Sequence, residues 1–237
     1  MGRRIVLVVM VMAFLSGMAA AQNETMSKER SNELQSMVNQ ANERQSSGDY
    51  NQAVMLYSQA AKGYLMHNMT KQAIELFEKA LKYSKMLGNT NGILILENQL
   101  GMLNYEQGNL SEATKYFSDG VDLSRNVGRK TDLATMLVSY SNVLFDQGNY
   151  ADAAKNVEEA TSIATQLSSL QLLQSCYSLS SRIAEKMGDR KKTAEYFELY
   201  SAVTKRIQQQ QMAANETEAN QKVEQAHQKV QEVVAAK

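Results

Sequence analysis

Turn-forming and hydrophobic positions recur along this chain with a period of twenty residues. One register position holds turn-favouring residues, in the order Gly48, Asn68, Gly88, Gly108, Gly128, Gly148, Ser168 and Gly188. Five residues after each corner stands a small or aliphatic residue, such as Ala113, and four residues later a larger one, such as Phe117. Residues four apart share one helix face, so the small residue admits a neighbouring helix and the larger one fills the space beside it. The pattern predicts one helix and one tight turn per unit.

Alternate units resemble each other most, which indicates a true repeat of about forty residues. Gly108-Asn109-Leu110 and Gly148-Asn149-Tyr150 belong to one set of corners, and Gly88-Asn89-Thr90 and Gly128-Arg129-Lys130 belong to another. A repeat of this length made of two helices is a helical hairpin. The sequence therefore predicts an all-α fold of about nine helices: the first over residues 27–46, seven of about seventeen residues, and a last helix that begins near Lys191.

The hairpins resemble the tetratricopeptide repeat (TPR) family in a forty-residue form. The segments that carry the resemblance are residues 100–110 with Ala113 and Phe117, residues 140–150 with Ala153, residues 48–50 with Ala53, Tyr57 and Ala60, and the trio Ala73, Phe77 and Ala80. The resemblance spans residues 31–200 and implies a right-handed α-solenoid of antiparallel hairpins. The proline that closes many such repeats is missing, and the packing glycine seen at Gly101 becomes Ala61, Ser141 and Ser181 in other units.

The first 21 residues follow the three-part plan of a secretory signal. Arg3 and Arg4 precede an apolar run over residues 5–15, and small residues end at Ala21 before Gln22. The alternative, a membrane anchor, is less favoured because eleven apolar residues span about half of a bilayer's hydrocarbon core. We therefore expect residues 1–21 to be a signal peptide, the chain to be exported to the periplasm or beyond the cell, and no stable membrane insertion after cleavage.

The C-terminal part departs from the repeat. Phe197, Leu199, Tyr200 and Val203 are expected to cap a solenoid that covers residues 22–207, and a glutamine run follows at residues 208–211. A three–four alternation returns at Ala219, Val223, Ala226, Val230 and Val233, but two heptads are fewer than a coiled coil usually needs. Three hypotheses for residues 208–237 remain open: a frayed polar helix, a disordered tail, or a short coiled coil that gives weak self-association or binds a partner.

Charge and residue inventory argue against several functions. The chain carries 25 basic and 25 acidic side chains, so it lacks the basic footprint that nucleic acid requires. His67 and His227 are far apart, no phosphate-binding glycine loop follows a strand, and Cys176 is expected to be a small buried residue. Carboxylate pairs such as Glu158-Glu159 are typical of a solvated helix face. The sequence therefore predicts no enzyme, no catalytic residue, no metal site and no cofactor.

The family resemblance implies a partner site instead. In such proteins the first helix of each hairpin lines a concave groove, and this places there Asn98, Met102, Tyr105, Glu106, Val138, Asn142, Phe145, Asp146, Ser178, Arg182, Glu185 and Lys186. Amides can satisfy the backbone of an extended peptide while Met102 and aromatic rings supply apolar contact. The alternative for Tyr105 and Phe145 is packing between helices. The basic clamp of chaperone-binding members is not matched, because Asn98 and Val138 stand where lysines are wanted.

Two functional hypotheses follow. In the first, the chain is an exported, non-catalytic scaffold or adaptor that holds a protein or peptide in its groove. In the second, it is an extracytoplasmic sensor or connector, because residues 196–207 and the glutamines after them resemble the stretch that joins TPR sensors to a membrane helix and a kinase. Neither of those elements follows in the printed sequence, so the second hypothesis requires a truncated gene product or a separate membrane partner.

Overall fold

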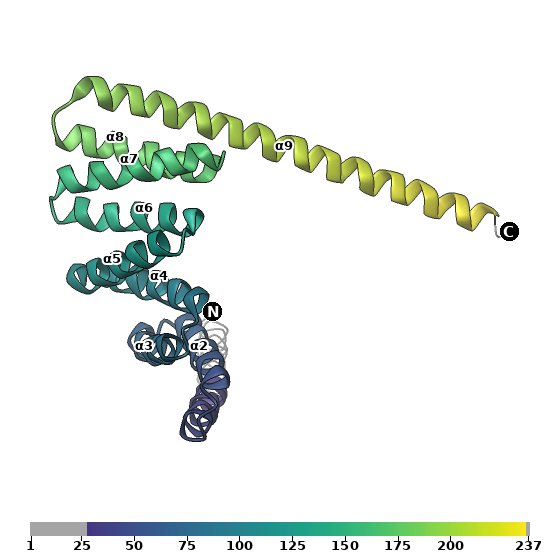
Figure 1. The fold of residues 1–237 in the computed structure, drawn as a ribbon. Helices are drawn as coiled ribbons and strands as arrows, with labels where there is room; N and C mark the ends of the chain where they lie inside the picture. Colours follow the sequence, from purple (N-terminus) through teal and green to yellow (C-terminus); the bar gives the residue numbers. More distant parts are fainter. Residues whose placement is uncertain (1–27, 236–237) are drawn as a thin grey trace, which may run out of the picture. The chain divides into compact units, whose positions relative to one another are not determined.

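The computed structural model describes residues 28–235, and helices joined by three-residue turns make up this part of the chain, with no strand (Figure 1). The first helix covers residues 28–46. It is followed by α2 (Tyr50–Met66), α3 (Thr70–Met86), α4 (Thr90–Glu106), α5 (Leu110–Asn126), α6 (Lys130–Asp146), α7 (Tyr150–Gln166), α8 (Leu170–Lys186) and α9 (Arg190–Ala235). The predicted all-α class with about nine helices is confirmed. The predicted signal peptide lies outside the described residues.

One backbone motif closes each turn. At the corner after α6, the Gly148 N–H donates to the Phe145 carbonyl (3.0 Å) and the Asn149 N–H donates to the Leu144 carbonyl (2.8 Å). This is the Schellman arrangement, which requires the corner residue to adopt a left-handed backbone. Gly148 has φ of 81°, and the other corners repeat the same pair of bonds. The twenty-residue register of the sequence is therefore a register of helix ends.

The residue after each corner also begins the next helix. The side chain of Asp49 accepts a hydrogen bond from the Gln52 N–H (3.2 Å), and that of Asp189 accepts one from the Lys192 N–H (3.0 Å). A side chain in this position satisfies an N–H that the first helical turn leaves open. Because one residue serves both helix ends, the turn needs only three residues, and consecutive helices must run antiparallel.

The chain divides into two compact units, which are described separately. Of the described residues, 28–103 form the first unit, in which α2 packs on α3. Residues 104–235 form the second unit, in which each of α5 to α8 packs on the next helix in the chain, and α6 also contacts α8. That last contact brings together the first helices of two successive hairpins.

The core of both units follows the predicted small-and-large register. Ala73 and Phe77 in the first unit are at most 1% exposed, and so are Ala113 and Phe117 in the second. Glu97 of α4 is an exception in its chemistry. It occupies the large position of the register and is 2% exposed, but it carries a charged side chain where other units have apolar ones. Its carboxylate lies 3.0 Å from the Nζ of Lys85.

Helix α9 corrects part of the sequence prediction. Phe197 and Leu199 were expected to cap the solenoid, but they are 61% and 43% exposed. Tyr200 and Val203 are half-buried, and Ile207 is 9% exposed. Beyond Ile207 the chain stays helical to Ala235, so the tail is a helix, which projects past the other helices of its unit (Figure 1). Among the helices described, none combines the length and apolar character needed to span a bilayer.

Candidate functional site

The predicted groove residues of the second unit lie on the last turn of α4, on α6 and on α8. A forty-residue repeat sets their positions, so that Asn142 of α6 corresponds to Arg182 of α8, and Tyr105 of α4 corresponds to Phe145 of α6. Because α6 contacts α8 directly, side chains from successive hairpins can reach each other on this face. We call the set Tyr105, Asn142, Phe145, Asp146 and Arg182 the groove cluster.

Tyr105 and Asp146 join the end of α4 to the end of α6. The Tyr105 hydroxyl donates a hydrogen bond to Oδ2 of Asp146 at 2.5 Å. Partial burial, followed by the hydrogen bond to Asp146 and its negative charge, raises the pKa of Tyr105 to about 12, while the nearby charge of Arg182 opposes the rise. Tyr105 therefore stays a neutral donor at physiological pH, and its half-buried ring is held in one orientation.

Arg182 joins α8 to α6 through two different contacts. Its guanidinium donates to Oδ1 of Asn142 (3.3 Å) and lies over the ring of Phe145, with Cζ 4.4 Å from the ring centroid. Asn142 is positioned in turn because its Nδ2 donates to the Val138 carbonyl (3.1 Å). Arg182 is exposed, and a guanidinium has further donors besides the one that Asn142 accepts. The cluster therefore presents a positioned cation to solvent.

The ring of Phe145 packs between Arg182 and a residue of the next helix, α7. It is 9% exposed, and Tyr150 of α7 meets its ring edge-on, with centroids 5.3 Å apart. This burial fits the alternative left open for Phe145, namely packing between helices, and the guanidinium of Arg182 lies over its ring. Sequence reasoning missed the contribution of Tyr150, although its place directly after the Gly-Asn corner could have indicated a residue that leans back on the preceding helix.

The other predicted residues are placed less uniformly. Val138 and Ser178 are half-buried, whereas Glu106, Glu185 and Lys186 are exposed. Glu185 lines a separate hollow with Ser181 and Phe197, at the end of the α8–α9 hairpin. In the first unit, Met102 is 43% exposed, while Asn98 is half-buried, with a buried Oδ1 that accepts no hydrogen bond from any described residue.

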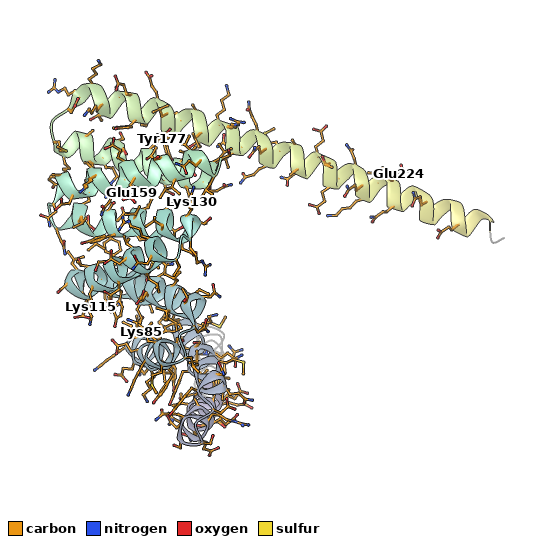
Figure 2. The ribbon with its side chains drawn as sticks, viewed as in Figure 1. Lys85, Lys115, Lys130, Glu159, Tyr177 and Glu224 are labelled. Atoms are coloured by element: carbon orange, nitrogen blue, oxygen red, sulfur yellow. The ribbon has the colours of Figure 1, made fainter. Side chains whose placement is uncertain are left out.

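Helix α7 makes polar contacts of a different kind with its neighbours in this unit. Arg125 of α5 forms a two-pronged contact with Glu159 of α7 (3.0 and 3.1 Å), and Lys130 of α6 donates to Gln166 of α7 (2.9 Å). Figure 2 labels Lys130 and Glu159 among the side chains of this unit. The Arg125–Glu159 pair links two successive hairpins, whereas the Lys130–Gln166 contact lies within one hairpin; both are exposed and contribute at most modestly to stability.

Within residues 28–235, no group of three or more metal-ligating side chains forms, and Cys176 is fully buried. Burial raises the pKa of the Cys176 thiol, with a weaker opposing contribution from a hydrogen bond to Thr161, so the reactive thiolate is disfavoured. The predicted role of Cys176 as a small buried residue agrees with this environment.

Comparison with known proteins identifies the repeat. The family model described as tetratricopeptide repeat matches residues 92–166, which include α5, α6 and α7. Residues 92–166 therefore match tetratricopeptide repeats. Among curated proteins, no sequence matches it.

Solved structures share the TPR fold at low sequence identity. BtubC (BKLC) from P. vanneervenii is 16% identical, with a TM-score of 0.61 over 71% of this chain and 78% of that one. TPR-like repeats of a putative kinesin light chain from Podosopora anserina are 17% identical, with a TM-score of 0.53 over 75% of this chain and 97% of that one. A STAND protein with a TPR sensor, PH0952 from Pyrococcus horikoshii, is 16% identical (TM-score 0.60), and the match covers 75% of this chain and 30% of that protein. Identities this low show the α-solenoid fold alone, and a TPR fold supports a protein–protein interaction scaffold.

Proposed function

We propose that the chain is an exported, non-catalytic adaptor that binds a peptide or protein segment across the groove cluster. The observation that carries this proposal is the positioned side-chain network on the first helices of successive hairpins. Tyr105 is fixed by Asp146, and the exposed Arg182 is fixed by Asn142 and Phe145. A partner that meets groups already fixed in place loses less conformational freedom on binding.

The chemistry of the cluster suits an extended peptide. Asn142 can bond a peptide backbone, Arg182 can bond a carbonyl or an acidic side chain, and its stacking on Phe145 restricts the guanidinium to a narrow set of positions. Glu106 and Lys186 are exposed beside them, so the face carries both charges. We infer that affinity depends on a few such anchors rather than on overall charge.

Binding can be tested with peptides selected from a random display library on the purified chain, followed by fluorescence anisotropy with one selected peptide. Asn142→Ala and Arg182→Gln should each weaken binding about tenfold or more, as for central anchors. Lys155→Ala, an exposed change on α7, is the matched control and should leave the dissociation constant unchanged. Equal affinity of all three variants would reject the groove cluster as the site.

Export is the second part of the proposal and rests on the sequence of residues 1–21 alone. N-terminal sequencing of the chain recovered from its native cells should give Gln22 as the first residue. Recovery of the intact N-terminus from the cytoplasm would contradict export without bearing on peptide binding.

A second candidate function, a sensor or connector, is favoured by one observation. Helix α9 continues to Ala235, about eight turns beyond Ile207, where a simple adaptor would need only a short cap. Removal of residues 208–237 should abolish signalling to a separate membrane partner under this hypothesis, while it should leave peptide affinity at the groove cluster intact.

A further inference from the structure

Phe197 is exposed at a register position that is buried elsewhere in the repeat. Phe117, at the same position in α5, is 1% exposed, and α5 packs against the next helix, α6. Phe197 is 61% exposed because α9 contacts only α8 within residues 28–235. A following antiparallel helix is therefore missing from this face, and Phe197 instead lines an open hollow with Ser181 and Glu185 of α8.

The uncovered face continues as a stripe along α9 into the projecting tail. At 3.6 residues per turn, ten exposed residues fall within about a quarter of the helix circumference. They are Ala194, Phe197, Ser201, Lys205, Gln208, Met212, Asn215, Ala219, Val223 and Ala226, here called the α9 stripe. The stripe covers 33 residues, or nearly five heptads, which exceeds the two heptads visible in the tail alone.

The α9 stripe is symmetric about Gln210. When two α9 helices run antiparallel and cross at this residue, Ala194 lies opposite Ala226, Phe197 opposite Val223, and Ser201 opposite Ala219. Lys205 then faces Asn215, and Gln208 faces Met212. Small or apolar residues meet at the three outer pairs apart from Ser201, and the two central pairs contain the polar residues Lys205, Asn215 and Gln208 together with Met212. Pairing of a surface with its own copy about a twofold axis is the usual geometry of a homodimer.

Charge complements this pairing. Residues 190–207 hold five basic and two acidic side chains, whereas the opposing residues 213–230 hold three acidic and two basic ones. Lys205 of one chain lies opposite Asn215 of the other, and Glu216 is the next residue on the same side of the stripe. Lys205 and Glu216 can therefore form an ion pair between chains, and the twofold axis gives two such pairs in each dimer. Figure 2 labels Glu224 in this more acidic part of the tail.

We propose that α9 is an antiparallel homodimerisation helix whose tail covers the solenoid end of a second copy. The tail of one chain supplies the antiparallel helix that Phe197 of the other chain lacks. Polar residues at the centre of the stripe fix the register and weaken the association. The dimer therefore forms reversibly, and because the α9 stripe contains no residue of the groove cluster, the cluster keeps its side chains for its own partner.

Sedimentation equilibrium of the purified chain at about 1–100 μM should show a reversible monomer–dimer equilibrium. Ala219→Asp, on the stripe, should weaken the dimer at least about tenfold because both copies bury the new charge. Ala213→Asp places the same substitution at an exposed position off the stripe and should change the constant less than about twofold. A chain that is monomeric at every concentration, or equal effects of the two variants, would overturn the proposal.

Orientation is tested by cross-linking and by charge reversal. Chains carrying Ser201→Cys and Ala219→Cys should form a disulfide only when the two variants are mixed, because these positions face each other in the antiparallel register. Lys205→Glu should weaken the dimer, and Lys205→Glu with Glu216→Lys should restore it. Cross-linking of either single variant with itself would instead indicate parallel helices and reject the proposal. A monomeric chain that still binds its selected peptide would overturn this inference and leave the adaptor proposal standing.

Discussion

Replacement of Gly148 by alanine isolates the energetic role of a repeat corner. Gly148 holds φ of 81°, and a Cβ at this position would meet no atom within 4 Å, so the substitution introduces no steric clash with neighbours. Its effect on the free energy of unfolding therefore comes from backbone conformation alone. An L-residue in the left-handed region costs about 1–2 kcal/mol. Alanine also has less conformational freedom than glycine in the unfolded chain, which stabilises the folded state by about 0.4–1 kcal/mol. The free energy of unfolding should therefore fall by about 1 kcal/mol in total.

The same reasoning predicts the opposite sign at Ser168. This residue occupies an equivalent corner with φ of 53°, and the hydrogen bonds of its turn match those at Gly148. Ser168→Gly should remove the left-handed cost of about 1–2 kcal/mol and add about 0.5–1 kcal/mol of unfolded-state entropy. The variant should therefore be more stable by roughly 0.5–1 kcal/mol. Gly148→Asn should cost less than Gly148→Ala, since asparagine tolerates this conformation, as Asn68 does here.

Urea unfolding followed by circular dichroism at 222 nm measures these differences. With an m-value of about 2 kcal/mol/M, a change of 1 kcal/mol moves the midpoint by about 0.5 M. The expected order of midpoints is Ser168→Gly, wild type, Gly148→Asn and Gly148→Ala, from highest to lowest. A lower midpoint for Ser168→Gly, or equal losses for the two Gly148 variants, would refute the claim that backbone conformation sets the stability of the corners.

Three further predictions test the core and the groove cluster. Ala153→Leu should destabilise by about 1–3 kcal/mol because Ala153 is 0% exposed, whereas the same change at exposed Ala151 should be nearly neutral in a thermal melt. Glu97→Leu together with Lys85→Met replaces both partners of their ion pair and should be neutral or stabilising by about 1–4 kcal/mol in urea titration; a large loss would contradict this. Asp146→Asn should lower the pKa of Tyr105 from about 12 toward 10, as read by ultraviolet difference titration against Tyr105→Phe. The stability that this raised pKa contributes is complete below pH 10 and is lost as the pH rises toward 12, so the Asp146→Asn variant should lose less stability across that window.

Helix ends and buried positions were predictable because both follow from local rules. A residue that must adopt a left-handed backbone restricts the sequence to glycine, asparagine and a few others, so corners such as Gly108 and Asn68 are visible in the chain. Spacing along a helix then identifies which residues share a face, and Ala113 and Phe117 are buried as that spacing predicts.

Contacts between helices were less accessible to sequence reasoning. The position of Tyr105 on the groove face was expected, but its hydrogen bond to Asp146 depends on how α4 and α6 approach each other. Likewise, helical spacing alone allows Phe145 to lie either in an exposed groove or in a packed core. In the structure its ring is 9% exposed and is covered by the guanidinium of Arg182, so it is packed. The exposure of Phe197 was missed because its register predicts burial, while burial also requires a following helix that this part of the chain does not supply.

Helix α8 connects the two proposed binding surfaces. Arg182 belongs to the groove cluster, whereas Ser181 and Glu185, one and three residues away, line the hollow beside Phe197. At about 100° per residue, Ser181 is turned about 100° from Arg182 and Glu185 about 60°, so a peptide at Arg182 and a second copy at Phe197 would occupy neighbouring faces of α8. Both can bind together if α8 keeps its place between α6 and α9. Measurement of peptide affinity for the Ala219→Asp and wild-type chains, at concentrations where only the wild type dimerises, tests this independence. Equal dissociation constants are expected, and a difference of about tenfold would reveal a coupling of about 1.4 kcal/mol between the two surfaces.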